Sequence, residues 1–286
     1  MIQKFSVLIT GMLGFLLMAS IVEAAPKVIV TEKDKSILQD KFGKFSNQRD
    51  LSVGELMARI GSDFAGTPYV ARTLDLSGEE NLVINLREFD CTTFVESCLA
   101  IARTIKSGEL TFEQFSAQLE KIRYRNGRLD GYASRLHYFS EWITDNEAKG
   151  VVADITAKLG GIKHPVSLGF MGSHPNFYPQ LKANPSLIIR IKQIEQRVSS
   201  KQFYFIPKEK LAGHEPKLRD GDIIALTTRI PGLDVSHLGL VVKMRNVVFL
   251  LNASSMDGKV ELTKAPLEQY LKGSKTVTGI FVIRTR

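Results

Sequence analysis

The chain has 286 residues, and its 38 Lys and Arg residues outnumber its 30 Asp and Glu residues to give a formal net charge of +8. This excess suits attraction to anionic polymers or acidic small molecules, but no basic-aromatic recognition motif accompanies it, which speaks against nucleic acid as a partner. The length is that of one large domain, or of one domain with a sizeable insertion.

The N-terminus has the pattern of a secretory signal. Lys4 precedes the apolar run 5–22, and Ala24 is the small residue that a signal peptidase prefers. We therefore expect residues 1–24 to be a cleaved signal peptide and the mature protein to be periplasmic or secreted, with no stable membrane anchor. The apolar run is short for a membrane span of about 20 residues, and a retained N-terminal anchor is the alternative.

A helix is predicted over residues 53–64. Ser52 and Glu55 have the spacing of a capping box, and apolar residues then recur on one face. The helix should end at Gly66-Thr67-Pro68-Tyr69, because Pro68 biases the residue before it towards an extended conformation. This turn would present Tyr69 at a fixed position.

A second helix is predicted to begin at or just before Cys91. Asp90 is a good N-cap, and Cys91, Phe94, Val95 and Cys98 lie on one helical face. Seven helical residues separate the two thiols by about 10.5 Å, so they cannot form a disulfide. A thiol at a helix N-terminus is expected to have a lowered pKa and to react as a thiolate. Cys91 is thus a candidate nucleophile, and Cys98 fits a buried core residue.

The middle of the chain combines helices with a long irregular stretch. Thr111 should cap a helix that buries Phe112 and the apolar residues after it, and another helix is expected over about 133–148. Residues 160–186 are rich in Gly and Pro, which predicts a long structured loop. Long loops inside a compact domain are often functional.

The C-terminal part has the pattern of an antiparallel sheet. Short runs rich in Val, Ile and Leu occupy residues 222–226, 237–242, 247–251 and 278–283, and turn residues punctuate them. Helices followed by such a sheet predict an α+β fold. We expect one domain over residues 25–286 that acts as a monomer.

A cysteine nucleophile needs a base, and the base needs a group that orients it. Of the five histidines, His237 starts a predicted core strand, where a rigid sheet can aim its ring. Asn252 closes the apolar run of the next strand and can accept the ring N–H if the two strands form a hairpin. An ordinary edge histidine and a strand-ending turn residue are the alternatives for these two positions.

Metal and cofactor chemistry lack their sequence patterns. No His-Glu-x-x-His or Cys-x-x-Cys motif occurs, and no Gly-rich phosphate loop or dinucleotide fingerprint is present. We expect no metal and no cofactor.

Six short motifs occur in a defined order along residues 50–286. The motifs are Gly66-Thr67-Pro68-Tyr69, Asp90-Cys91-Thr92-Thr93-Phe94, Arg135-Leu136-His137-Tyr138-Phe139-Ser140-Glu141-Trp142, Phe170-Met171-Gly172-Ser173-His174-Pro175, Asp220-Gly221-Asp222-Ile223 and Ser236-His237-Leu238-Gly239. Together they resemble the NlpC-like superfamily of papain-related cell-wall hydrolases, and the third and fourth of them resemble its N-acetylmuramoyl-L-alanine amidase-like branch.

The resemblance implies a papain-like, circularly arranged α+β core in which the helix of the nucleophile packs on the sheet. Cys91, His237 and Asn252 match the nucleophile, base and orienting positions, and Tyr69 matches a tyrosine near the nucleophile. Common superfamily members have Ser-Gly after Asp-Cys, whereas Thr92 and Thr93 follow here. The segment 104–216 is also much longer than in minimal members and counts as an insertion, so substrate selection cannot be transferred from them.

The implied activity is hydrolysis of the amide between N-acetylmuramic acid, preferably in its 1,6-anhydro form, and L-Ala of soluble peptidoglycan fragments. We expect substrate contacts from Tyr69 and Ser236, and from a loop around Ser173, His174 and Tyr178 that folds over the cleft of Cys91. An endopeptidase that cuts after γ-D-Glu of the stem peptide is the first alternative. A non-catalytic muropeptide-binding protein is the second.

Overall fold

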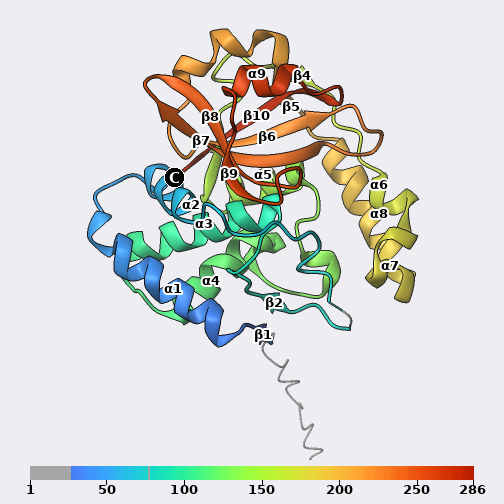
Figure 1. Ribbon diagram of the computed structural model, residues 1–286. Coiled ribbons are helices and arrows are strands. Elements are labelled where there is room, and N and C mark those ends of the chain that lie inside the picture. The colour runs from blue at the N-terminus through green and yellow to red at the C-terminus, as the bar shows by residue number, and fades with distance from the viewer. Residues whose placement is uncertain (1–26, 77) are drawn as a thin grey trace, which may run out of the picture.

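The computed structural model describes residues 27–76 and 78–286 (Figure 1). The predicted signal peptide, residues 1–24, lies outside this part of the chain. Within the described residues, no helix is both long enough and apolar enough to span a membrane.

A large antiparallel sheet is the centre of the fold. Within the described residues it has eight strands in the order β4-β5-β10-β6-β7-β8-β9, with β3 also paired to β10. A separate parallel pair joins β1 to β2. The strands are β1 (Val28–Ile29), β2 (Leu82–Val83), β3 (Val152–Asp154), β4 (Ile162–His164), β5 (Phe203–Pro207), β6 (Ile223–Thr228), β7 (Val235–Met244), β8 (Val247–Ser254), β9 (Lys259–Leu262) and β10 (Val277–Thr285).

Helices cover both faces of this sheet. In Figure 1, α2, α3 and α5 lie below the sheet, α9 lies above it, and α6 to α8 lie to one side. The helices are α1 (Glu32–Phe45), α2 (Val53–Asp63), α3 (Cys91–Ser107), α4 (Phe112–Arg123), α5 (Phe139–Ala148), α6 (Phe170–Ser173), α7 (Pro179–Ala183), α8 (Ser186–Ser199) and α9 (Leu267–Lys272).

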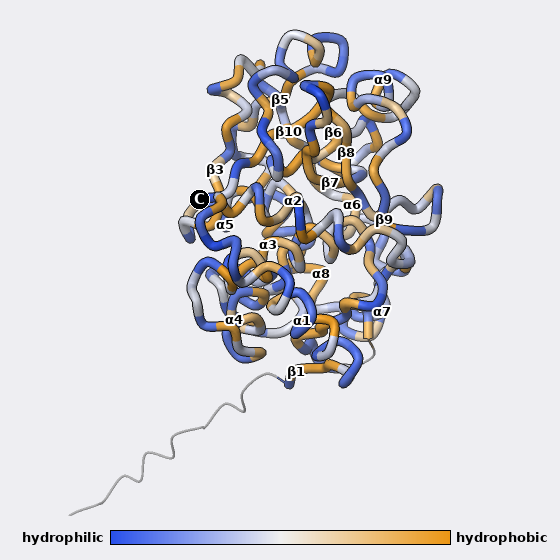
Figure 2. Tube along the Cα trace, turned by 60° about the vertical axis from the view of Figure 1, so that its left-hand side comes forward, coloured by the Kyte–Doolittle hydropathy of each residue, from blue (hydrophilic) through white to orange (hydrophobic). Residues whose placement is uncertain are grey.

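The strands alternate between two hydrophobic cores because successive side chains of a strand point to opposite faces. In β6, Ile223 and Ala225 join the main core with α2 and α3, whereas Ile224 and Leu226 join a smaller core under α9. Among the described residues, hydrophobic residues gather along β6, β7, β8 and β10, and many peripheral loops are hydrophilic (Figure 2). The expected combination of helices with an antiparallel sheet is therefore confirmed.

Local sequence signals located several elements correctly. The capping box of Ser52 and Glu55 is formed, and α2 begins at Val53 as predicted. The helix α3 begins at Cys91, with the Asp90 side chain accepting the N–H of Thr93 at 2.8 Å. The four predicted strands correspond to β6, β7, β8 and β10.

Two expectations in the middle of the chain were wrong. The helix predicted over 133–148 begins only at Phe139, because the backbone of Arg135 is extended and the N–H of Leu136 donates to the Arg123 carbonyl at 3.0 Å. The stretch 160–186 is not a continuous loop but contains β4, α6 and α7. Pro175 and Pro179 lie in the first turns of short helices, where a missing N–H costs nothing.

The long segment 104–216 is built into the domain. It supplies α4, α5 and α6 to α8, and also the strands β3, β4 and β5 of the large sheet. Both β3 and β5 pair with β10, the last strand of the chain. The segment therefore forms part of the core as well as the region beside the cleft.

Candidate active site

Cys91 is the first residue of α3 and is half-buried. The α3 N-terminus points its free backbone N–H groups towards this position. Both cysteines of the described chain are free thiols, and Cys98 is fully buried in the main core as expected. The structure thus separates one thiol at a cleft from one thiol in the core.

The sulfur of Cys91 lies beside the strand that carries His237. The backbone N–H of Leu238, the residue after His237, hydrogen-bonds to the Cys91 thiol, and the hydroxyl of Thr92 does so as well. Cys91 and His237 also line the same cavity. The structure therefore brings these two predicted residues together.

The pKa of Cys91 has the opposite direction from that expected of a thiol at a helix N-terminus. Burial, together with the negative charge of Asp90, raises the pKa of Cys91 to about 12. The hydrogen bonds from Leu238 and Thr92 oppose this rise without cancelling it. The macrodipole is a partial charge, and here desolvation of the thiolate outweighs it. Cys91 consequently rests as a thiol and needs a base to become nucleophilic.

His237 and Asn252 form the pair that the sequence predicted. The Nε2 atom of His237 lies 2.8 Å from Oδ1 of Asn252. Asn252 is almost fully buried, and its Nδ2 faces the carbonyl oxygens of Leu250 and Glu261 at 3.3 Å each. Because Nδ2 faces two acceptors, Oδ1 must face the ring, and Nε2 of His237 carries the proton. Nδ1 is then the basic nitrogen.

Asn252 reaches His237 across a glycine. Asn252 lies inside β8, which continues to Ser254, and does not end the strand as expected. Leu240 faces Leu251 in the β7–β8 register, so the next pair along the ladder places Gly239 opposite Asn252 and leaves His237 diagonal to it. A Cβ atom on Gly239 would come within 2.7 Å of the Leu250 side chain and 2.8 Å of the Leu251 carbonyl oxygen. The close approach of the strands here requires glycine.

Burial also determines the protonation of His237. It lowers the pKa of the imidazole, and the hydrogen bond to Asn252 opposes this shift. A neutral imidazole beside a neutral thiol is thus the resting state of the pair. In this state Nδ1 can accept the thiol proton when a substrate is attacked.

A cavity of about 250 Å³ opens beside Cys91. Ligand sites commonly range from about 300 to 1,000 Å³, so this cavity fits one group of a larger substrate. Its walls come from the start of α3, the segment leading into α5, α6 with the residues after it, and the start of β7. The lining residues are Cys91, Thr92, Leu136, His137, Tyr138, Phe139, Trp142, Met171, Tyr178, Leu233, Asp234, Val235, Ser236, His237 and Leu238.

A buried carboxylate fastens one wall to the sheet. Asp234 accepts the N–H of Ser140 at 2.6 Å and the N–H of Val235 at 2.8 Å. The first contact satisfies a free N–H group in the first turn of α5, as an N-cap side chain would. Asp234 therefore fixes the start of α5 against the start of β7.

A second buried carboxylate fastens the wall that α6 forms. The hydroxyl of Tyr138 donates to Glu195 of α8 at 2.6 Å and accepts the N–H of Met171 at 2.9 Å. Glu195 also accepts the N–H of Gly172 at 2.9 Å. These bonds hold α6 against the cavity, so the wall is ordered despite its Gly and Pro content.

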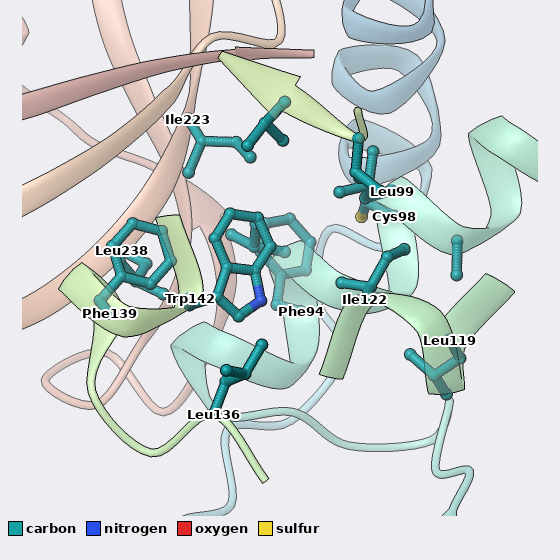
Figure 3. Packing of buried hydrophobic residues seen from close by; sticks show 14 of the residues in the cluster. Phe94, Cys98, Leu99, Leu119, Ile122, Leu136, Phe139, Trp142, Ile223 and Leu238 are labelled. Carbon is teal, nitrogen blue, oxygen red and sulfur yellow. The ribbon is translucent and has the colours of Figure 1, made fainter. Parts of the chain in front are cut away.

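Trp142 connects the cavity to the helix of the nucleophile. Figure 3 shows its indole between Phe94 of α3 and Phe139 of α5, and the rings of Phe139 and Trp142 stack with centroids 4.9 Å apart. Its Nε1 donates to Glu96 of α3 at 3.3 Å, and Glu96 forms a buried ion pair with Arg123 at 2.7 Å. The position of the indole is thus tied to that of α3.

Tyr69 lies close to Cys91. Its N–H donates to the Gly258 carbonyl at 2.8 Å, and the segment pairs with Phe89, two residues before Cys91. Burial, followed by the proximity of the ionisable side chains of Cys91 and Asp90, raises the pKa of its hydroxyl. Tyr69 therefore keeps a neutral O–H group close to the sulfur.

The other predicted substrate contacts divide into two groups. Ser236 and Tyr178 line the cavity, and Met171 of the same loop joins them. Ser173 and His174 are exposed and are not among the lining residues. The His174 ring stacks between Phe170 and Phe177, and its Nδ1 lies 2.9 Å from the Phe170 carbonyl oxygen. The role of Ser173 and His174 in substrate binding stays a prediction that this geometry does not support.

His137 lines the cavity but was not predicted as a residue of the site. Its Nε2 donates to the Tyr132 carbonyl at 2.9 Å, and its ring packs on the Tyr132 ring. Burial and the positive charge of Arg135 hold its pKa well below the ordinary value. His137 is thus a neutral wall residue. Its place in the motif from Arg135 to Trp142 was the sequence signal that could have identified it as a residue of the site.

Among the described residues, no three His, Cys, Asp or Glu side chains form a group that could hold a metal ion.

The AmiA-like family, described as N-acetylmuramoyl-L-alanine amidase-like, matches residues 59–280. The chain belongs to this family. The match includes Cys91, His237, Asn252 and the whole wall of the cavity. No curated protein matches the chain.

Several solved structures resemble this amidase-like chain. An N-acetylmuramoyl-L-alanine amidase from Bacteroides uniformis ATCC 8492 is 43% identical, with a TM-score of 0.79 over 82% of this chain and 99% of the other. A Bacteroides fragilis protein that carries a xylanase name is 44% identical, with a TM-score of 0.75 over 79% and 99%. A Legionella pneumophila protein at 22% identity and a TM-score of 0.66, over 88% of this chain and 94% of the other, shares the fold.

Proposed function

We propose that the protein hydrolyses the amide between N-acetylmuramic acid, preferably in its 1,6-anhydro form, and L-Ala of soluble peptidoglycan fragments. The observation that carries this proposal is the Asn252-oriented His237 beside Cys91 at a helix N-terminus. Membership of the amidase-like family supports the choice of bond. The papain-like, circular arrangement and the NlpC-like superfamily are part of the same proposal.

The proposed reaction begins with transfer of the Cys91 thiol proton to Nδ1 of His237. The sulfur attacks the lactyl carbonyl, and the carbonyl oxygen becomes an oxyanion. Backbone N–H groups at the start of α3, with the Tyr69 hydroxyl, can donate to this oxygen. When the C–N bond breaks, His237 returns the proton to the amine of L-Ala, which leaves.

The second half of the reaction regenerates the enzyme. His237 takes a proton from water, and the resulting hydroxide attacks the thioester carbonyl. The C–S bond breaks, the sulfur regains a proton and the muramic acid carboxylate departs. Asn252 holds the ring through both steps, so the same nitrogen faces Cys91 each time.

A glycosidase site is not supported by the cavity, although one similar structure carries a xylanase name. Glycosidases commonly use two carboxylic groups about 5 to 9.5 Å apart. The cavity lining includes one carboxylate, Asp234, and both of its oxygens accept backbone N–H groups. A thiol, an imidazole and an amide instead match acyl transfer.

Mass spectrometry of the products from one defined anhydro-disaccharide tripeptide tests the proposal. The expected products are the intact free tripeptide and the anhydro-disaccharide with a free lactyl carboxylate. Cleavage after γ-D-Glu would favour the endopeptidase, and binding without turnover would favour a muropeptide-binding protein. We also propose that the protein acts as a periplasmic or secreted monomer without a metal, so EDTA should leave the rate unchanged.

A further inference from the structure

Arg72 has an unusual backbone conformation on the segment between Tyr69 and the cavity wall. Its φ of 63° lies in the left-handed region, which costs a non-glycine residue about 1–2 kcal/mol. Its side chain is exposed and forms no hydrogen bond or ion pair within the described ranges 27–76 and 78–286. A strained position that keeps an unpaired guanidinium at the surface is a candidate for function.

The segment that carries Arg72 is fixed at both ends. At one end, Tyr69 is bonded to Gly258 and lies beside Cys91. At the other end, Asp75 accepts a bond from Arg135 at 2.9 Å, and the Leu76 carbonyl accepts one from Gln180 of α7, also at 2.9 Å. The segment therefore runs from the nucleophile to the wall formed by Tyr178 and α7, and Arg72 lies between these two anchors.

Arg72 is close to the cavity by two independent criteria. It follows Tyr69 by three residues, which span at most about 11 Å. Its positive charge also acts on Tyr178, a lining residue, by opposing the rise that burial causes in the pKa of that hydroxyl. The exposed guanidinium is thus available near Tyr178, at the rim of the cavity that this tyrosine lines.

We propose that Arg72 binds a carboxylate of the stem peptide and selects substrates with an acidic stem. This inference rests on the proposed function. Cleavage at L-Ala places the stem peptide outside the cavity, and a γ-linked D-Glu keeps a free α-carboxylate one residue beyond L-Ala. Arginine donates two parallel N–H groups to a carboxylate in a fork that lysine cannot reproduce.

The chain offers a matched control for this residue. Arg245 is also an exposed arginine with a positive φ of 50°, and it lies in the β7–β8 turn. It follows His237 by eight positions along β7 and the turn, a distance of about 26 Å for extended chain. Replacement of either arginine by glycine removes one positive charge and relieves the same type of backbone strain. Only Arg72→Gly removes a charge at the rim.

The test compares kcat and KM of Arg72→Gly and Arg245→Gly on two muropeptides, one with a free D-Glu α-carboxylate and one with this group amidated. Both variants should melt at or above the wild-type Tm. Arg72→Gly should lose about 10-fold in kcat/KM through KM on the free-carboxylate substrate and nothing on the amidated one, whereas Arg245→Gly should match wild type on both. Arg72→Lys should lie in between. Equal kinetics for the two glycine variants would overturn the proposal.

A binding experiment tests the role of Arg72 independently of the proposed reaction. In the Cys91→Ala background, calorimetry with the free tripeptide L-Ala-γ-D-Glu-diaminopimelate and its amidated counterpart requires no turnover. Binding that prefers the free carboxylate, and that loses this preference with Arg72→Gly, supports the role of Arg72 whichever bond the enzyme cuts. Failure to bind either peptide, or a preference that survives Arg72→Gly, shows that Arg72 is not the contact.

Discussion

His237 donates its Nε2 proton to the side-chain oxygen of Asn252 at 2.8 Å, and two backbone carbonyls hold the amide of Asn252 in the one orientation that permits this bond. The tautomer of the base is therefore set by the sheet. Nδ1 of His237 takes no part in this bond, and the sulfur of Cys91 is bonded by the next N–H of the same strand.

The two cysteines should respond differently to removal of the thiol. Cys91→Ala should abolish turnover with little change in Tm, because the side chain is half-buried and small. Cys98→Ala should remain active and lose about 1 kcal/mol of unfolding free energy, because it leaves a small cavity in the core. Turnover assays and denaturant titrations of both variants check this pair. An active Cys91→Ala protein would remove this residue from the mechanism.

Loss of the proposed base should reduce activity more than loss of the residue that orients it. His237→Ala should be as inactive as Cys91→Ala, whereas Asn252→Ala should lose about 10- to 100-fold in kcat, as expected when a buried hydrogen bond of about 1–3 kcal/mol is removed. Asn252→Asp keeps an acceptor for Nε2 and should retain more activity than Asn252→Ala. Its carboxylate should also raise the pKa of His237, so the acid limb of its pH profile should move to higher pH.

Alkylation should report the resting state of the thiol. Because burial and Asp90 raise the pKa of Cys91 to about 12, the thiolate fraction at neutral pH is small, and iodoacetamide should react more slowly than with a model thiol of ordinary pKa. The rate should keep rising as the pH is increased above neutrality. The lowered pKa of His237 keeps the imidazole neutral below its ordinary value of 6.5, so kcat/KM should hold to a lower pH than an unperturbed histidine would allow. Rapid alkylation below pH 7 would instead indicate a thiolate–imidazolium pair.

Gly239 should tolerate no side chain. A Cβ atom there would force apart Leu250 and the neighbouring backbone, so Gly239→Ala should cost about 1–3 kcal/mol of stability and displace Asn252 from His237. The control is Gly43→Ala in α1, where the new Cβ meets nothing within 4 Å and a gain of about 0.5–1 kcal/mol is expected. Comparable Tm and kcat values for the two variants would show that β7 and β8 can separate without harm.

The residues after α6 that line the cavity should contribute to substrate binding. Tyr178→Ala should raise KM for the muropeptide and leave the iodoacetamide rate at Cys91 nearly unchanged, because Tyr178 lines the cavity. The double variant Ser173→Ala/His174→Ala should change KM less, since both side chains are exposed. An equal loss in the double variant would mean that this surface closes over the substrate.

The sequence predicted best the features that depend on neighbouring residues. Capping of α3 by Asp90 and the short apolar strands are local, so the positions of Cys91 and His237 followed from them. The start of α5 could not be predicted, because the N–H of Leu136 donates to Arg123 and because Asp234, which is distant in sequence and precedes β7, supplies the N–H acceptor. The predicted shift of the Cys91 pKa had the wrong direction for a related reason. Burial depends on the tertiary structure, and a prediction made from the helix N-terminus alone does not include it.

The last strand, β10, lies in the middle of the large sheet, with β6 on one side and β3 and β5 on the other. Its partners come from residues 152–154, 203–207 and 223–228, so the sheet cannot close until residues 277–285 have been synthesised. Most pairings in this region join distant parts of the sequence, and formation of such contacts is slow. Loss of β10 would therefore prevent the sheet from forming, and it would expose unpaired strand edges on which chaperones could act.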